Sequence, residues 1–228
     1  MTAHVLDRPV WSALSTRQHA VSVGDDRARR YAPDIGPLAG CRDDSPESLR
    51  ALAELVPAGG SLVVLQVDPI VLPAGPVTVT SAPAVQMIAE RLVVPPPDAR
   101  PTIERLTEVD APAMLALATL TRPGPFARRT PSLGEFWGVK DGGVLVAMAG
   151  ERMQQPGFTE VSGVCSHPDA RGRGLARALS AHVAARISAR GDVPYLAAYA
   201  TNTAALELYR SLGFVARRTV QVATLTRA

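Results

Sequence analysis

The chain has 228 residues, of which 46% are apolar and only 4% aromatic, and its formal net charge is +3. This composition is typical of a soluble globular protein with a core of Ala, Val and Leu, and it excludes a chain that is disordered throughout. The arginines are scattered among acidic residues without long basic runs, so we expect no nucleic acid among its partners.

The cysteines and the first eleven residues indicate the cellular compartment of the protein. Cys41 and Cys165 are the two cysteines, too few for a disulfide framework or for paired metal ligands, so we expect reduced thiols and no metal. Charged side chains interrupt the first eleven residues, where a secretory signal needs an apolar core. No stretch approaches the roughly 20 apolar residues of a membrane-spanning helix. The sequence therefore predicts a cytoplasmic protein without a membrane partner.

A proline-rich segment from Val94 to Pro101 divides the chain. Proline removes the backbone donor and favours an extended chain, which neither a helix nor a central strand can use. We therefore predict a boundary near residue 98, with an N-terminal α/β lobe over residues 1–98 and a larger domain over residues 99–228.

The N-terminal lobe shows three elements in chain order. Ser45 followed by Pro46 predicts the start of a helix, which ends before Pro57. Residues 61–67 and 76–80 are β-branched or aliphatic runs between turn residues and predict strands. The lobe contains no nucleophile with a partnered base, no glycine-rich phosphate loop and no cluster of metal ligands, so its residues predict no chemistry of their own.

The domain over residues 99–228 shows a longer and clearer series of elements. A strand over residues 102–106 and a helix ending near Leu120 come first, and three strands of an antiparallel meander follow. These three strands cover residues 136–140, 144–153 and 158–166. A helix over 174–190, a strand over 195–200, a helix from Asn202 to Leu212 and a strand over 214–226 complete the series. The predicted fold class is α/β, with a mixed, mostly antiparallel sheet flanked by helices.

The most informative segment is a glycine-rich turn that leads from a strand into the helix at Gly174. Arg171, Arg173 and Arg177 crowd this helix start, although the helix dipole favours negative charge there. A bound phosphate resolves the conflict, because glycines let backbone amides approach its oxygens and arginines add charge. The segment therefore predicts a pyrophosphate site. The alternative is a solvated turn in which the glycines serve geometry alone.

Two motifs in this domain resemble the GNAT superfamily of coenzyme A-dependent N-acyltransferases. Arg171, Gly174 and Ala176 match the family's first signature, and the segment from Asn202 to Phe214 is similar to its later motif. The resemblance covers about residues 102–226. It implies the GNAT fold, acetyl-coenzyme A as co-substrate, and a primary amine, small molecule or peptide, as acceptor of the acetyl group.

The resemblance also implies roles for single residues. Main-chain groups of Val164, Cys165 and Ser166 would pair with the pantetheine arm. The pyrophosphate would be held by the turn and helix start, which comprise Arg171, Gly172, Arg173, Gly174, Leu175, Ala176 and Arg177. Asn202 would contact the cofactor, and an Asn at this place is also a good helix cap.

Tyr209 and Glu160 are the two candidate catalytic residues. Tyr209 stands where the family commonly keeps the general acid that protonates the departing thiolate, although a tyrosine on an amphipathic helix often only packs its ring. The amine acceptor must lose a proton before it attacks. The resemblance implies Glu160 as the candidate base, because some GNAT members carry the base at this place of the strand, and strand alternation puts Glu160 on one face with Ser162 and Val164. A water chain and a purely structural ion pair of Glu160 are the alternatives.

Other side chains carry weaker predictions. Cys165 has no evident base, which argues against a covalent acyl-enzyme. Trp137 fits either the acceptor pocket or the core, and His182 lacks the second ligand that a metal site needs.

Larger alternatives also stay open. The chain could be a non-catalytic acyl-coenzyme A sensor, and a generic nucleotide-binding domain is less consistent with a glycine turn that follows a meander. Three interpretations of the N-terminal lobe stay open. It could be a degenerate copy of the GNAT fold, it could shape the acceptor cleft, or it could form the contact of a homodimer.

Overall fold

The structure, a computed structural model, describes residues 4–72, 77–93 and 101–227. Its helices are α1 (Pro9–Ser15), α2 (Pro46–Glu54), α3 (Ala111–Thr121), α4 (Leu175–Ala189) and α5 (Thr203–Ser211). Its strands are β1 (Ser22–Gly24), β2 (Ala28–Tyr31), β3 (Leu38–Cys41), β4 (Ser61–Gln66), β5 (Val77–Ala89), β6 (Glu104–Leu106), β7 (Phe136–Asp141), β8 (Val144–Gln155), β9 (Phe158–Ser166), β10 (Val193–Tyr199) and β11 (Phe214–Arg227). None of the helices in the described part of the chain has the length and apolar character that spanning a bilayer requires.

All these strands form one sheet in the order β1-β2-β3-β4-β11-β5-β10-β9-β8-β7-β6. Neighbours are antiparallel except for β3 with β4 and β9 with β10, which are parallel. The predicted fold class, a mixed and mostly antiparallel sheet flanked by helices, is therefore confirmed.

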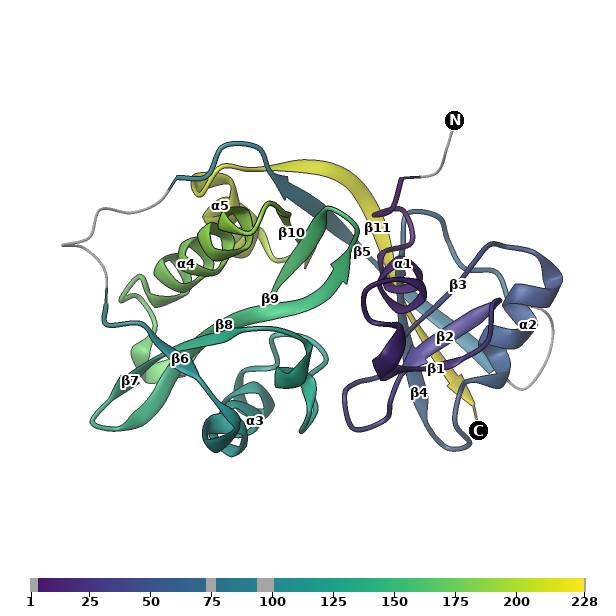
Figure 1. The fold of residues 1–228 in the computed structure, drawn as a ribbon, viewed down its shortest axis with the longest axis horizontal. Coiled ribbons are helices and arrows are strands. Elements are labelled where there is room, and N and C mark those ends of the chain that lie inside the picture. Colours follow the sequence, from purple (N-terminus) through teal and green to yellow (C-terminus); the bar gives the residue numbers. More distant parts are fainter. Residues whose placement is uncertain (1–3, 73–76, 94–100, 228) are drawn as a thin grey trace.

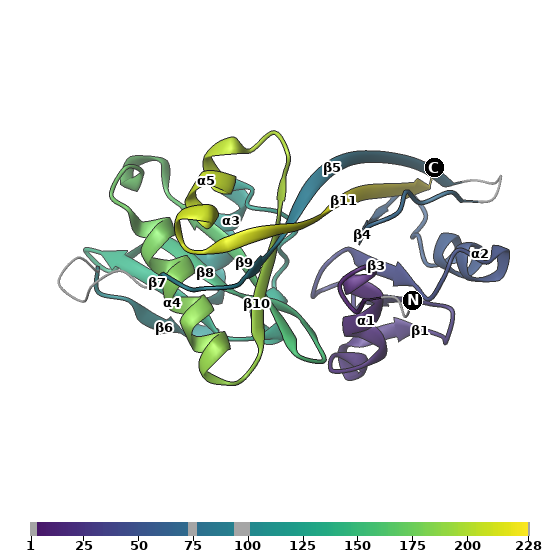
Figure 2. The same ribbon diagram turned by 90° about the horizontal axis from the view of Figure 1, so that it is seen from above.

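The two long strands β5 and β11 connect the lobes. They pair antiparallel from Ala89 with Phe214 to Val77 with Arg227, and both views show them side by side from one lobe to the other (Figures 1 and 2). Of the predicted boundary segment, residues 94–100 lie outside the described residues. Pro76, at the start of the strand predicted over residues 76–80, also lies outside them. The sheet nevertheless places β5, which precedes that segment, between two strands that follow it.

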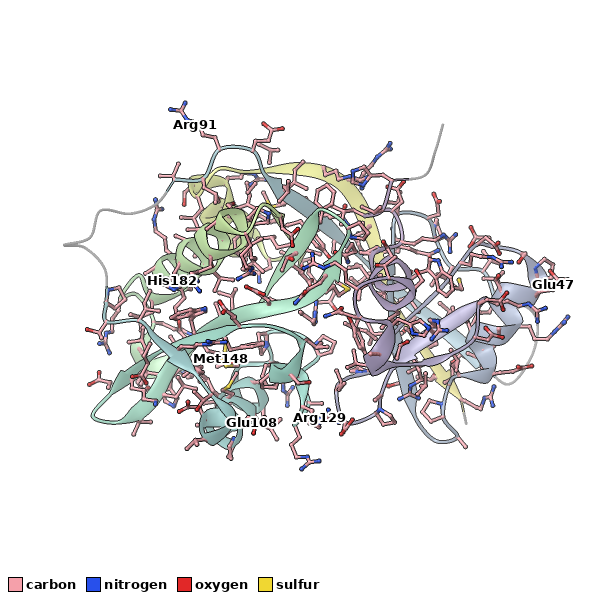
Figure 3. The ribbon with its side chains drawn as sticks, in the orientation of Figure 1. Glu47, Arg91, Glu108, Arg129, Met148 and His182 are labelled. Atoms are coloured by element: carbon pink, nitrogen blue, oxygen red, sulfur yellow. The ribbon has the colours of Figure 1, made fainter. Side chains whose placement is uncertain are left out.

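Helices cover both faces of the C-terminal part of the sheet, with α4 and α5 on one side and α3 on the other (Figure 1). The predicted stripe of α4 is confirmed, since Leu179, Val183 and Ile187 are fully buried against the sheet. Below the sheet, Met114 and Leu117 of α3 pack with Met148 of β8, which is labelled in Figure 3.

The N-terminal helix α1 binds the two lobes into one core. Val10 and Leu14 belong to the same buried cluster as Met153 of β8 and Tyr195 of β10. The buried Gln155 side chain adds a hydrogen bond to the carbonyl oxygen of Pro9, with a nitrogen–oxygen distance of 2.8 Å. The sequence did not predict α1 or the short strands β1 to β3, because these segments are too short or too polar to show a period.

Candidate active site

The candidate site begins where β9 and β10 separate. Their parallel pairing ends at Glu160 with Tyr195, although β9 continues to Ser166 and β10 to Tyr199. The register between β8 and β9 shifts opposite Gly163, whose φ is +64°, which is a β-bulge that bends the strand. Beyond the bulge, β9 still pairs with β8 on one edge, and its other edge faces a gap where β10 has moved away.

A cavity of about 730 Å³ occupies this gap. It is lined by the end of β9, the start of α4, the facing residues of β10 and α5, the loop after α3 and a wall from the N-terminal lobe. All the predicted cofactor-binding residues except Arg173 line it, and so does Tyr209. The structure therefore brings together residues that the sequence separates by more than forty positions.

The glycine-rich turn offers unpaired amides to this cavity. Gly172 and Gly174 have φ of +76° and +73°, and no atom lies within 4 Å of a Cβ built on either. The amides from Gly172 to Gly174 donate to no atom in the described residues, and the first amides of α4 have no partner within the helix because of helix geometry. Such a row of donors at a helix N-terminus is a site for an anion.

The three arginines of the turn have different partners. Arg173 forms an ion pair with Asp141 at 2.9 Å, and Arg177 donates to the hydroxyl oxygen of Ser211 at 2.6 Å. The guanidinium of Arg171 pairs with no residue that the structure describes. Arg171 is therefore the cation of the turn that is most available to an anionic ligand.

Asn202 caps the helix that carries Tyr209. Its side-chain oxygen accepts a hydrogen bond from the amide of Ala205 at 3.2 Å, as predicted for the start of α5. The side-chain nitrogen of Asn202 does not take part in the cap and can donate to another partner. A contact of Asn202 with a cofactor stays a prediction.

Tyr209 lines the cavity with a side chain whose ring is packed. Its half-buried ring lies 6.0 Å from the ring of Phe214 in an edge-on arrangement, and its hydroxyl has no hydrogen bond within the described residues. Burial, together with the negative charge of Glu160, raises the pKa of Tyr209 to about 12. The hydroxyl therefore keeps its proton at neutral pH, as a proton donor must.

Glu160 is buried and already paired. Its side chain is 2% exposed, and its two oxygens accept hydrogen bonds from Nε and Nη2 of Arg152, each at 2.8 Å. Arg152 lines the cavity whereas Glu160 does not. The structure thus shows the ion pair that was one of the alternatives for Glu160, and its role as a base stays untested.

One prediction about this strand is wrong. Alternation was expected to place Val164 on one face with Glu160, but Val164 packs in the same cluster beneath α4 as Val161. The bulge at Gly163 adds one residue to β9, and an added residue reverses the face of everything that follows it.

The remaining side chains have structural partners. Burial raises the pKa of the Cys165 thiol to about 11, which leaves little thiolate for nucleophilic attack. Trp137 lies outside the cavity, with its ring 4.4 Å from that of His182 on α4 (Figure 3 labels His182). Trp137 therefore fits the second of its two interpretations, the core.

Arg152 is the site residue that the sequence analysis missed. A signal existed, because Arg152 stands in the otherwise largely apolar strand β8 and Glu160 follows on the next strand of the same hairpin. A charge pair of this kind is visible only once the register between the two strands is known.

Known proteins share the sequence and fold of this chain. The profile of the FR47-like protein family matches residues 137–222. A crystal structure from Novosphingobium aromaticivorans, of a protein classed as an acetyltransferase of the GNAT family, is 44% identical, with a TM-score of 0.91 over 99% of this chain and 100% of that one.

More distant structures share the fold alone. A GCN5-related N-acetyltransferase from Kribbella flavida is 18% identical, with a TM-score of 0.65 over 95% of this chain and 96% of that one. A Drosophila protein is 17% identical, with a TM-score of 0.61 over 87% of this chain and 73% of that one. No curated protein matches the chain.

Proposed function

The chain belongs to the GNAT family of acetyltransferases, and from this premise we propose that it transfers an acetyl group from acetyl-coenzyme A to a primary amine in a ternary complex. The observation that carries the proposal is that one cavity is lined both by the glycine turn, whose amides have no partner in the described residues, and by Tyr209. Acetyl-coenzyme A supplies the activated acetyl thioester.

The residues around the cavity fit this co-substrate. Gly172 and Gly174 leave open space where side chains would stand, so a diphosphate can approach the amides closely while Arg171 offsets its charge. The main chain from Val164 to Ser166 faces the gap between β9 and β10, where an amide-containing arm can pair as an added strand does.

Tyr209 is proposed as the general acid. When the amine nitrogen bonds to the acetyl carbon, the carbon–sulfur bond breaks and the departing sulfur takes the hydroxyl proton of Tyr209. Main-chain amides at the end of β9 steady the negative charge that develops on the acetyl oxygen. Solvent then returns a proton to Tyr209.

The proton of the amine needs a separate route. Glu160 was one candidate, but both its oxygens are engaged by Arg152 and it does not line the cavity. These contacts support the alternative, in which water in the cavity carries the amine proton to solvent and Glu160 holds Arg152 in place.

Calorimetry with acetyl-coenzyme A, followed by a thiol-release assay across a panel of amines, tests this proposal. We expect binding, and release of free thiol that depends on the amine. Binding without thiol release from any amine would contradict the transferase and support the alternative of an acyl-coenzyme A sensor.

A further inference from the structure

The cavity extends beyond the part that the co-substrate would use. One wall is apolar and consists of Leu38, Val63, Leu65 and Ala84 of the N-terminal lobe together with Val222 of β11. Alternation along β4 explains this wall, because Val63 and Leu65 face it while Leu62 and Val64 pack toward α2. If the proposed function holds, this end of the cavity receives the acceptor amine.

The charges on the cavity wall all have one sign. Of the described residues that line it, the charged ones are Arg122, Arg152, Arg171 and Arg177. Arg171 lies in the turn before α4 and Arg177 in its first turn, where the proposed function places the diphosphate. Arg122 and Arg152 stand apart from it. Glu160 offsets the charge of Arg152, so it is the guanidinium of Arg122, without an ion-pair partner in the described residues, that favours a molecule with a negative charge.

Arg152 is oriented for such a charge. Its Nε and Nη2 are fixed by the two oxygens of Glu160, whereas Nη1 has no hydrogen-bond partner within the described residues. Nη1 lies 4.0 Å from the position that a Cβ would take on Gly124, in the loop that borders the cavity. A planar guanidinium held along one edge keeps its remaining donor in a fixed direction.

Arg122 is held in an unusual backbone conformation on the same loop. It ends α3 with φ of +50°. Among the described residues other than glycine, Arg122 alone has a positive φ. Glycine is the residue that helix ends prefer in this conformation. The Arg122 guanidinium makes no ion pair or hydrogen bond within the described residues, so packing or pairing does not account for an arginine there.

We propose that the acceptor is a primary amine that also carries a carboxylate and an apolar substituent, as a free aliphatic amino acid does, and that Arg152 Nη1 and Arg122 hold the carboxylate. The apolar wall of the N-terminal lobe then receives the aliphatic side chain. The proposal rests on the proposed function and assigns the substrate class of the same cavity.

The experiment compares leucine with leucinamide, which has the same shape without the negative charge. The value of kcat/KM for each is measured at one pH on the full chain, on Arg122→Gly and on Arg128→Gly. Glycine suits the conformation at residue 122, so the first variant removes the guanidinium without straining the fold. Arg128 is exposed and does not line the cavity, so the second variant is a control for the lost charge.

We expect kcat/KM for leucine to fall about 10-fold or more in Arg122→Gly through a higher KM, because a charge-assisted hydrogen bond is lost. The value of kcat/KM for leucinamide should not change in Arg122→Gly. In Arg128→Gly, the ratio of kcat/KM for leucine to kcat/KM for leucinamide should equal that of the unmodified protein. Because each ratio is compared between proteins, the different basicities of the two amines cancel.

An unchanged ratio in Arg122→Gly would overturn the proposal. It would also be overturned, while the proposed function stood, if phenethylamine were acetylated in preference to leucine. If acetyl-coenzyme A bound but no amine released thiol, the proposed function itself would fail, and the acceptor assignment with it.

Discussion

Among single residues, Tyr209 has the most direct proposed role, because its hydroxyl would donate the proton to the departing sulfur. Tyr209→Phe keeps the ring that packs near Phe214 and removes only the hydroxyl. We expect kcat to fall by about 100-fold or more, the usual range for loss of a general acid, while calorimetry shows unchanged affinity for acetyl-coenzyme A. Unchanged turnover would remove Tyr209 from the mechanism.

The raised pKa of Tyr209 makes a prediction about alkaline pH. Since this pKa is about 12, against about 10 for free tyrosine, the hydroxyl stays protonated and kcat should not decline between pH 8 and pH 10. The stability that this proton contributes is fully present below pH 10 and is lost as pH rises through about 12. A kcat profile at saturating substrates checks this, and an alkaline decline with an apparent pKa below 10 would contradict it.

Glu160 is the residue for which two roles can be separated by one substitution. In Glu160→Gln an oxygen still accepts from Arg152, so we expect kcat within a few-fold of the unmodified protein and a higher KM for leucine, as a positioning residue predicts. A loss in kcat of about 100-fold or more, with the acid limb of the pH profile abolished, would instead identify Glu160 as the base.

Site residues were predictable where the signal is local. Arg171, Gly172 and Gly174 follow from one turn, and the cap at Asn202 follows from one helix start. The site roles of Asn202 and Tyr209 came from the resemblance to the GNAT superfamily. Arg152 did not follow, because its partner Glu160 lies on the next strand and the register between them contains irregularities. The face of Val164 was missed because strict alternation was assumed through Gly163, although a glycine inside a strand often marks a bulge.

At the scale of elements, the turn before α4 should bind the diphosphate through its backbone. Gly174→Ala places a side chain at φ of +73°, and we expect a loss of about 1–2 kcal/mol in the free energy of unfolding together with weaker binding of acetyl-coenzyme A. Gly142→Ala is the matched control, because Gly142 has φ of +56° and equally open space but does not line the cavity.

The control should lose comparable stability and keep its affinity, as measured by denaturant titration and calorimetry. Equal affinity in both variants would show that the turn does not hold the ligand.

Helices and strands were predicted correctly where their apolar residues recur at a regular spacing or a clear turn signal separates them. The helix α4 shows four apolar residues at four-residue steps, and the hairpin of β7 and β8 contains two glycines at its turn, so both were predictable. The strands β2 and β3 have only four residues each, and no pattern of period two can be recognised in so short a run. The strand β5 extends nine residues beyond the predicted end at residue 80, because Pro83 and the alanines around it weaken the strand signal.

At the scale of the whole molecule, β5 makes the two lobes one folding unit. It pairs with β11 on one side and β10 on the other, and α1 packs against residues of both lobes. We expect one cooperative unfolding transition, and we expect residues 99–228 expressed alone to lack a folded near-UV circular dichroism spectrum, because β10 and β11 lose their shared neighbour. Two separate transitions, or a folded fragment with acetyl-coenzyme A affinity, would contradict this.

The arrangement of the lobes was beyond prediction for a physical reason. The proline-rich segment predicts a break in regular structure, but a break in sequence does not say which strands pair across it. Placing β5 in the sheet depends on backbone pairing between residues more than a hundred positions apart, such as Ile88 with Val215. The same pairing brings the N-terminal lobe to the cavity, which is why its residues predicted no chemistry alone.

Binding of the diphosphate of acetyl-coenzyme A at the start of α4 can be measured by calorimetry with two ligands. Acetyl-coenzyme A is titrated into the full chain beside S-acetylpantetheine, which has the same thioester arm without phosphates. We expect the phosphate-free ligand to bind at least about 100-fold more weakly, since several charge-assisted hydrogen bonds are missing. Equal affinities for the two ligands would contradict this expectation.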